Sequence, residues 1–246
     1  MSHAWDLADA AAARAGIAFR EMTTVEDADL INEVIEVTWG GQHLDREVVR
    51  ALAVSGNVPI AAEVDGTVVG FVLGWAGVDR DGLHVHSHML AARPDRRHAG
   101  VGTALKLAQR AQALGAGIHV MRWTFDPLVG RNAWFNLGKL GVVADRFERA
   151  FYGRMTDAIN AGERSDRFVV RWDLDREPEM RRVEPAAVVA EVPIPRRYAE
   201  LTPDERVEAR EEFAVAVEAA MAVGAVAAAF RRDEATYVFA REEDVT

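Results

Sequence analysis

The stretch Arg93–Lys106 reads RPDRRHAGVGTALK, and it decides how the rest of the chain can be interpreted. A turn with three arginines and one histidine leads into two closely spaced glycines, and the apolar pattern of a helix follows. Glycines at a helix start let the backbone approach a ligand, and the N–H groups there favour an anion. Arginine adds positive charge. The stretch therefore predicts a pyrophosphate-binding loop, or else a solvated basic turn that only begins a helix.

The basic stretch contrasts with an acidic chain. The 246 residues include 39 acidic and 29 basic side chains, for a net charge of −10. Such a chain is a poor candidate for binding nucleic acid or an anionic membrane surface. No cysteine is present, which excludes disulfides, thiolate catalysis and cysteine-zinc sites. We expect a cytoplasmic protein with no leader segment, and its arginine and alanine usage suggests a bacterial, high-GC coding sequence.

Two common glycine motifs do not fit this stretch. A dinucleotide fingerprint needs a third glycine where the chain has Leu105, and a P-loop needs Gly-Lys-Ser/Thr, which is absent. The pattern that remains is Arg97-x-x-Gly100-x-Gly102, followed by Thr103.

The chain order is that of a mixed α/β protein. Asp65-Gly66 between two β-rich runs predicts a hairpin, and Pro127 follows Asp126 at the end of a strand. We expect strands at 17–22, 82–92, 118–125, 142–152 and 167–174, and helices at 24–37, 45–54, 100–114 and 131–140.

The composition changes near Asp175. Residues 176–198 contain four prolines and predict a linker with one short strand. Thr202 and Glu205 then form the pattern of a capping box, and a helix and a strand pair follow. We therefore predict a core at residues 1–174 and a C-terminal αβ extension at residues 175–246.

The glycine pattern, with a strand before it and a helix after it, resembles the acetyl-CoA signature of the GNAT superfamily of N-acetyltransferases. RNAWFNLGKLGV at 131–142 is similar to a downstream helix of that superfamily, and the likeness covers about residues 17–174. The strings LHVHSHM and WTFDPL resemble an uncharacterised subfamily of predicted acetyltransferases with a C-terminal extension. The resemblance implies an α/β (α+β) GNAT-type acyl-CoA N-acyltransferase fold, with a mixed central sheet flanked by helices.

The resemblance also implies where acetyl-CoA, the co-substrate, would bind. Backbone groups of Leu90, Ala91 and Ala92 would pair with the pantetheine arm like an added strand. Asn132, or less directly Asn136, would contact the coenzyme arm. The pyrophosphate would be held by consecutive residues of the loop, namely Arg97, His98, Ala99, Gly100, Val101, Gly102 and Thr103.

Three histidines supply candidate proton acceptors. His84, His86 and His88 alternate along one strand, so they should face the same side of the sheet. By the resemblance, His86 and His88 occupy the positions of a histidine pair that passes protons in arylalkylamine acetyltransferases. Structural roles stay open for both, and we expect one for His84. A zinc site with His119 or Asp126 is the other alternative, but the coenzyme signature brings no metal requirement.

Two further positions bear on the chemistry. Asp126 could orient a histidine or accept the amine proton, or it could simply shape the Asp-Pro turn. The tyrosine that usually protonates the leaving thiol in the superfamily is replaced by Leu137, which cannot donate a proton. Tyr152 or water would have to serve.

Two functions are compatible with these features. The first is an acetyl-CoA-dependent N-acetyltransferase, in which an amine of an unidentified, small acceptor attacks the thioester directly. The second is a catalytically weak or inactive acyl-CoA-binding regulatory module, which Leu137 favours and the histidine pair disfavours. We expect a homodimer, and no nucleic-acid or membrane partner.

Overall fold

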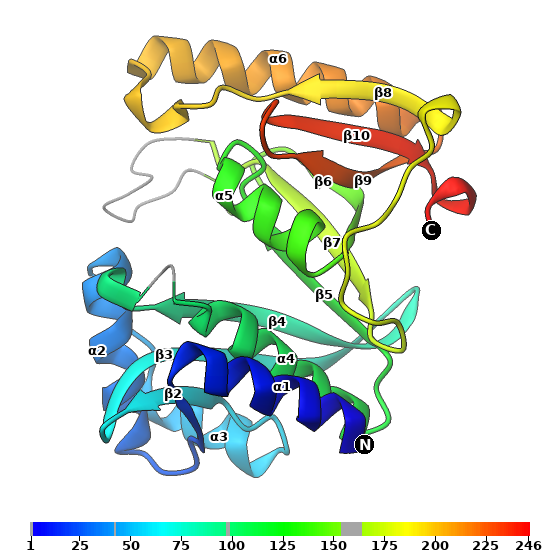
Figure 1. The fold of residues 1–246 in the computed structure, drawn as a ribbon. Coiled ribbons are helices and arrows are strands. Elements are labelled where there is room, and N and C mark those ends of the chain that lie inside the picture. The colour runs from blue at the N-terminus through cyan, green and yellow to red at the C-terminus, as the bar shows by residue number, and fades with distance from the viewer. Residues whose placement is uncertain (1, 42, 97–98, 154–163) are drawn as a thin grey trace. The chain divides into compact units, whose positions relative to one another are not determined.

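The computed structural model describes the chain except for residues 1, 42, 97–98 and 154–163 (Figure 1). Its internal contacts divide the chain into two compact units, one up to Met121 and the other from Arg122 onward. The predicted boundary at residue 174 does not coincide with this division and stays a prediction.

Within its described residues, the first unit contains a four-stranded antiparallel sheet and four α-helices. Its strands lie in the order β1-β2-β3-β4. Asp65 and Gly66 both have positive φ angles, 49° and 76°, as a tight two-residue hairpin turn requires. This confirms the predicted hairpin. The elements are α1 (Ser2–Ala15), β1 (Ala18–Glu21), α2 (Asp27–Trp39), α3 (Arg46–Val54), β2 (Ile60–Val64), β3 (Thr67–Asp79), β4 (Gly82–Ala92) and α4 (Val101–Gly115).

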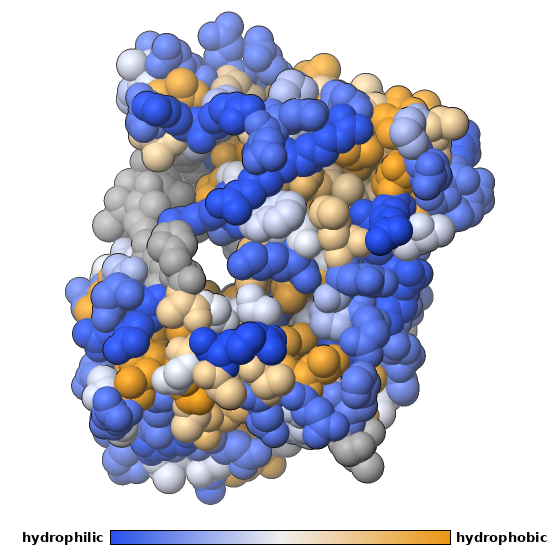
Figure 2. Space-filling model, viewed as in Figure 1, coloured by the Kyte–Doolittle hydropathy of each residue, from blue (hydrophilic) through white to orange (hydrophobic). Residues whose placement is uncertain are grey.

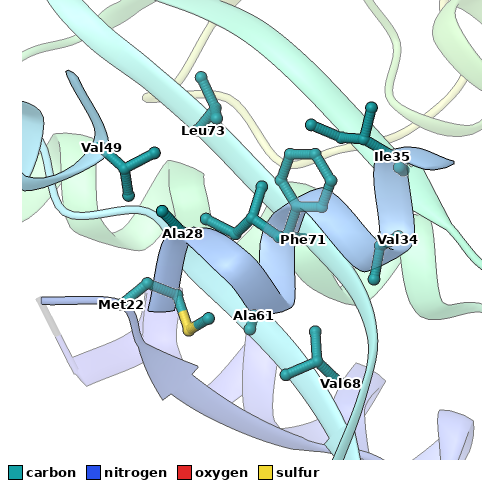
Figure 3. Close-up of a cluster of buried hydrophobic side chains, with 11 residues drawn as sticks. Met22, Ala28, Val34, Ile35, Val49, Ala61, Val68, Phe71 and Leu73 are labelled. Carbon is teal, nitrogen blue, oxygen red and sulfur yellow. The ribbon is translucent and has the colours of Figure 1, made fainter. Parts of the chain in front are cut away.

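The core of the first unit lies between α2, α3 and one face of the sheet (Figure 3). The helical spacing of the apolar residues in α2 puts Ile31, Val34 and Ile35 on its buried side. They pack in one cluster with Phe71 and Leu73 of β3, and all five are at most 2% exposed. Helix α4 contacts both α1 and the strands β2, β3 and β4.

The second unit contains the remaining strands and the long helix α6. The strand order is β5-β7-β6-β9-β10-β8, and the pairs β6–β7, β6–β9, β9–β10 and β10–β8 are antiparallel. The predicted helix at 131–140 consists of a short α-helix and a π-helical segment. The elements are β5 (Val120–Phe125, mostly in this unit), α5 (Gly130–Ala133), the π-helical segment Trp134–Lys139, β6 (Val143–Glu148), β7 (Arg167–Asp173), β8 (Val188–Pro193), α6 (Pro203–Ala222), β9 (Ala225–Arg231) and β10 (Thr236–Arg241).

Aromatic rings fill the core of the second unit. Phe168 of β7 has ring centroids within 5.2–5.9 Å of Phe147, Phe213 and Tyr237. Phe213 belongs to α6 and Tyr237 to β10, and both are at most 4% exposed. Residues predicted as the C-terminal extension therefore share a hydrophobic core with β6 and β7.

The proline-containing segment after β7 is packed against its neighbours rather than extended as a free linker. Gly141, with φ +67°, lies so close to this segment that an added Cβ would collide with the carbonyl oxygen of Glu179. Arg181 Nε donates a 2.7 Å hydrogen bond to the carbonyl oxygen of Gly141. The predicted capping box of α6 is confirmed, since Thr202 and Glu205 exchange both expected hydrogen bonds.

Hydrophilic and hydrophobic residues are interspersed on the face shown in Figure 2. Within the described part of the chain, no helix is both long and apolar enough to cross a membrane.

Candidate functional site

His86 and His88 of β4 lie against Trp75 of the neighbouring strand β3. The ring centroid of Trp75 is 5.1 Å from that of His86 and 4.9 Å from that of His88. The two imidazole centroids are 5.8 Å apart. Trp75 is directly opposite His86 in the strand pairing. The three rings therefore form one cluster, here called the Trp75 cluster, on one side of the sheet.

His84 is held in a different environment. It is buried, and its Nδ1 lies 3.2 Å from the carbonyl oxygen of Gly82 and 3.8 Å from Asp79 Oδ1. The partner opposite it on β3 is Gly77, where an added Cβ would lie 3.3 Å from His84 Nε2. The ring thus fills the space over a glycine, in agreement with the structural role expected for it.

Both imidazoles of the Trp75 cluster are neutral at neutral pH. Burial, together with smaller electrostatic effects of His88, His84 and Lys106, lowers the pKa of His86 to about 4. Burial also lowers the pKa of His88. A neutral imidazole has a free nitrogen lone pair, so either ring can accept a proton, although a pKa near 4 makes His86 a weak base.

The predicted pyrophosphate loop leads into α4. Gly100 is the N-cap residue, with φ 88°, a left-handed conformation that glycine adopts without strain. Because the bond from Ala104 N–H to Gly100 O is the first of the helix, the N–H groups of Val101, Gly102 and Thr103 precede the helical ladder. Ala99 N–H instead donates to Arg96 O at 3.2 Å. Arg97 and His98 lie outside the described residues.

Leu90, Ala91 and Ala92 form the end of β4, where they pair with residues 72, 71 and 70 of β3. Ala91 is only 4% exposed and belongs to the core cluster of the first unit. An added Cβ on Gly70 would lie 2.7 Å from Ala91 O, so the two backbones approach closely there. Arg93 N–H extends the pairing by donating to Val69 O at 2.8 Å.

Asp126, in the second unit, is engaged by two arginines and its own turn. Its Oδ1 accepts a hydrogen bond from Leu128 N–H at 2.9 Å, as in an Asx-turn. Its Oδ2 lies 3.0 Å from Arg210 Nη2 and 3.5 Å from Arg167 Nη1. Arg210 also donates to Tyr198 Oη at 3.0 Å. These contacts match the structural alternative, and proton acceptance by Asp126 stays a prediction.

The arginines that meet Asp126 could not be found from the sequence. Arg167 is 41 residues away in the chain and Arg210 is 84 residues away. Arginine is the usual basic residue of this chain, so neither residue stands out by its type.

The residues near the π-helical segment also have defined contacts. Asn136 is buried, accepts a 3.0 Å hydrogen bond from Trp123 Nε1 and donates a 2.9 Å bond to Asn132 O, so it bridges neighbouring elements. Asn132 itself is half-buried. Leu137 is completely buried. Tyr152 Oη is 3.2 Å from Thr124 Oγ1 of β5, and its side chain is exposed.

Lys106 is a buried polar residue of the first unit that the sequence analysis did not single out. Lys106 is 1% exposed, and its Nζ donates a 2.7 Å hydrogen bond to Ser87 Oγ. Burial puts the pKa of Lys106 well below its ordinary value of 10.5. A signal was available, because Lys106 is one of two lysines in the chain and stands among apolar helix residues. As for metals, no group of three or more potential ligands was found in the described part of the chain.

Comparison with known proteins bears on family and fold. Residues 28–138 match the acetyltransferase (GNAT) family. No curated protein sequence matches the chain. The structure resembles the ribosomal-protein-S18-alanine N-acetyltransferase of Escherichia coli, at 13% identity and a TM-score of 0.51, over 65% of this chain and 96% of that one.

Two further solved structures are similar. Naa20 of Chaetomium thermophilum, solved with a bisubstrate analogue, has 16% identity and a TM-score of 0.51, over 66% of this chain and 91% of that one. A protein of Desulfovibrio desulfuricans assigned to the GNAT family has 21% identity and a TM-score of 0.50, over 64% of this chain and 99% of that one. At these identities the likeness concerns the fold alone, and it agrees with the predicted GNAT-type α/β fold. The match to the acetyltransferase (GNAT) family lies within residues 28–138, a little under half of the chain, and it supports the enzyme class, acyltransferase.

Proposed function

We propose that the protein transfers an acetyl group from acetyl-CoA to the amine of a small acceptor. The Trp75 cluster carries this proposal, because it places two neutral imidazoles side by side on β4, in the same compact unit as the glycine-led start of α4. A neutral imidazole can accept the proton that an ammonium group must lose before it can act as a nucleophile.

The histidines would act on the amine rather than on the coenzyme. An ammonium must lose one proton before its nitrogen can attack the thioester carbon, and it loses a second as the amide forms. His86, with a pKa of about 4, holds a proton only briefly. His88 is more exposed, so it can pass the proton on to water. We therefore assign proton transfer to His86 and His88 as a pair.

The start of α4 would hold the coenzyme. Acetyl-CoA supplies the activated acetyl thioester and carries a pyrophosphate that needs N–H donors. The N–H groups of Val101, Gly102 and Thr103 stand at the positive end of a 15-residue helix, which suits such an anion. We further assign the backbone of 90–92 and Asn132 to the coenzyme arm. For Asp126 we favour the structural alternative, because arginines bind its carboxylate, and the Asp126→Asn variant tests proton acceptance.

The leaving thiolate would take its proton from Tyr152 or from water. Leu137 cannot provide it. The lack of a proton donor at position 137 favours the second candidate function, an acyl-CoA-binding regulatory module with little or no turnover. The acceptor would be a small amine, and the net charge of −10 speaks against nucleic acid.

Calorimetric titration of acetyl-CoA tests the coenzyme assignment. Gly102→Glu puts a negative charge in the first turn of α4, where it should weaken binding at least 100-fold. Gly115→Glu is the matched control, since it makes the same change at the last residue of the same helix, in open space. Equal binding by both variants would contradict the assignment.

Thiol release with a panel of small amines then separates the two functions. The enzyme should release coenzyme A only with an acceptor, and His88→Ala should slow release about 100-fold or more. Tight binding without release for any amine would favour the regulatory module. Turnover by His88→Ala within about threefold of the unchanged protein would remove His88 from the mechanism.

Homodimerisation and a cytoplasmic location stay predictions. Sedimentation velocity at high protein concentration checks the first, and a monomer there would contradict it.

A further inference from the structure

A buried hydrogen-bonded network lies directly behind the Trp75 cluster. Ser87 stands between His86 and His88 in β4, but its side chain meets α4 on the opposite face of the sheet. Lys106 Nζ donates to Ser87 Oγ at 2.7 Å, and Ser87 Oγ donates to Gln109 Oε1 at 2.8 Å. Lys106 Nζ also lies 3.3 Å from Gln109 Oε1. All three residues are at most 5% exposed. We call them the Lys106 network.

The strand β4 has a bulge at this point. Leu73 of β3 pairs with Met89, and the next residue, Gly74, pairs with Ser87, so His88 has no partner in the ladder between β3 and β4. Residues directly opposite in a ladder share a face of the sheet. Met89 therefore shares a face with Leu73, in contact with the core cluster under α2, and Ser87 shares the α4 face with Gly74.

The bulge decides which face each histidine takes. Without it, the ladder would continue from Met89 to His88 opposite Gly74 and to Ser87 opposite Trp75. A slip of one residue moves every following side chain to the other face. His86 and His88 would then point towards α4, and the hydroxyl of Ser87 would point towards the apolar cluster.

Polar and steric contacts both favour the bulged register. In the bulged register, the buried hydroxyl, amine and amide form hydrogen bonds with one another. In the other register, Ser87 would lie in the apolar cluster without these hydrogen bonds, which would destabilise the fold. Gly74 permits the close approach of the two strands. A Cβ added there would collide with His86 O and would lie 2.9 Å from Ser87 Cα and 3.0 Å from Gln109 Nε2.

We propose that Lys106, Ser87 and Gln109 are positioning residues, which fix the register of β4 and so place His86 and His88 together against Trp75. The inference rests on the proposed function only for its effect on catalysis, since the register itself can be observed without turnover. The proposal also explains why a lysine is buried on the face of β4 opposite the histidines.

The test replaces the whole network by apolar residues, with Ser87→Ala, Lys106→Met and Gln109→Met combined. Replacing all partners at once leaves no buried polar atom of the network unmatched, so the variant should fold. Leu105→Ala is the control, because it opens a cavity in the same helix without touching the network. Ser87→Ala alone, the smallest change, decides the question if the combined variant does not fold.

The first measurement is the set of nuclear Overhauser contacts between the Trp75 ring and the rings of His86 and His88. They should be present in the unchanged protein and in Leu105→Ala, and weakened or lost in the network variants. The second is acetyl transfer, for which kcat should fall at least tenfold while KM for acetyl-CoA changes less than threefold.

Folded network variants that keep both ring contacts and an unchanged kcat would overturn the proposal. A second outcome is that the network variants lose the ring contacts as expected, but the unchanged protein transfers acetyl to no amine. This outcome would support the register role and refute the proposed function. The two failures are therefore distinguishable.

Discussion

The ion pair between Asp126 and Arg210 should be measurable as a coupling energy in the second unit. The two side chains are 13% and 5% exposed, and their closest charged atoms are 3.0 Å apart. At an effective dielectric constant of 20 their attraction is about 5–6 kcal/mol. The measured coupling should be smaller than this attraction, because Arg167 Nη1 lies 3.5 Å from the same carboxylate and can partly replace Arg210. We therefore expect a coupling of about 1–3 kcal/mol, within the range found for residues in one salt-bridge network.

A double-mutant cycle in urea measures this coupling. Arg210→Met should lower the free energy of unfolding by about 3–5 kcal/mol, because it removes one partner of a buried carboxylate. Asp126→Asn should cost less, about 1–3 kcal/mol, since an asparagine can still accept the hydrogen bond from Leu128 N–H. The double variant should cost less than the sum of the two.

The same variants decide what Asp126 does. If its role is structural, Asp126→Asn should reduce kcat less than about tenfold, because general-base residues typically contribute 100-fold or more. A coupling below about 0.5 kcal/mol would refute the ion-pair reasoning. A stable but inactive Asp126→Asn would show instead that the carboxylate accepts the amine proton.

Three further outcomes are expected. Gly141→Ala should lower the free energy of unfolding in urea by about 3 kcal/mol or more. Gly117→Ala is the control, because Gly117 has a similar positive φ but open space around it, and it should cost only about 1 kcal/mol. Equal losses for the two variants would mean that the segment at Glu179 is not packed against Gly141. Thr202→Ala should lower the unfolding free energy by about 1 kcal/mol through loss of the capping box, and thermal melting that does not change would contradict this. Finally, the pKa of His86 lies below its ordinary 6.5, so the unfolded chain binds a proton first and stability should fall as the pH drops from about 6.5 to 4. An NMR titration of His86 with a midpoint near 6.5 would show that the ring is not buried as described.

Local sequence signals predicted the elements well where one physical rule dominates. Asp65-Gly66 can form a two-residue hairpin turn with two positive φ angles, and the structure has that turn. Thr202 and Glu205 satisfy each other's backbone donors within one helical turn, so the start of α6 was visible in the sequence. The glycine at position 100 likewise predicted where α4 begins.

Longer-range features were beyond these rules. The late strand expected at 142–152 ends at Glu148, because the residues after it turn and hydrogen-bond with Ser165, which precedes β7. The segment at 176–198 contains prolines and looks like a linker, but the surface that it packs on, at Gly141, lies more than thirty residues earlier.

The sequence by itself indicated the GNAT-type fold, the helix that begins at the glycine loop, and the alternation of the histidines along β4. Only the tertiary structure decided which face of the sheet those histidines occupy. Alternation fixes the relative orientation of neighbouring side chains, but a bulge changes that orientation by one residue. The bulge depends on contacts between β4, Gly74 and the Lys106 network, and these residues meet only when the sheet and α4 have packed together.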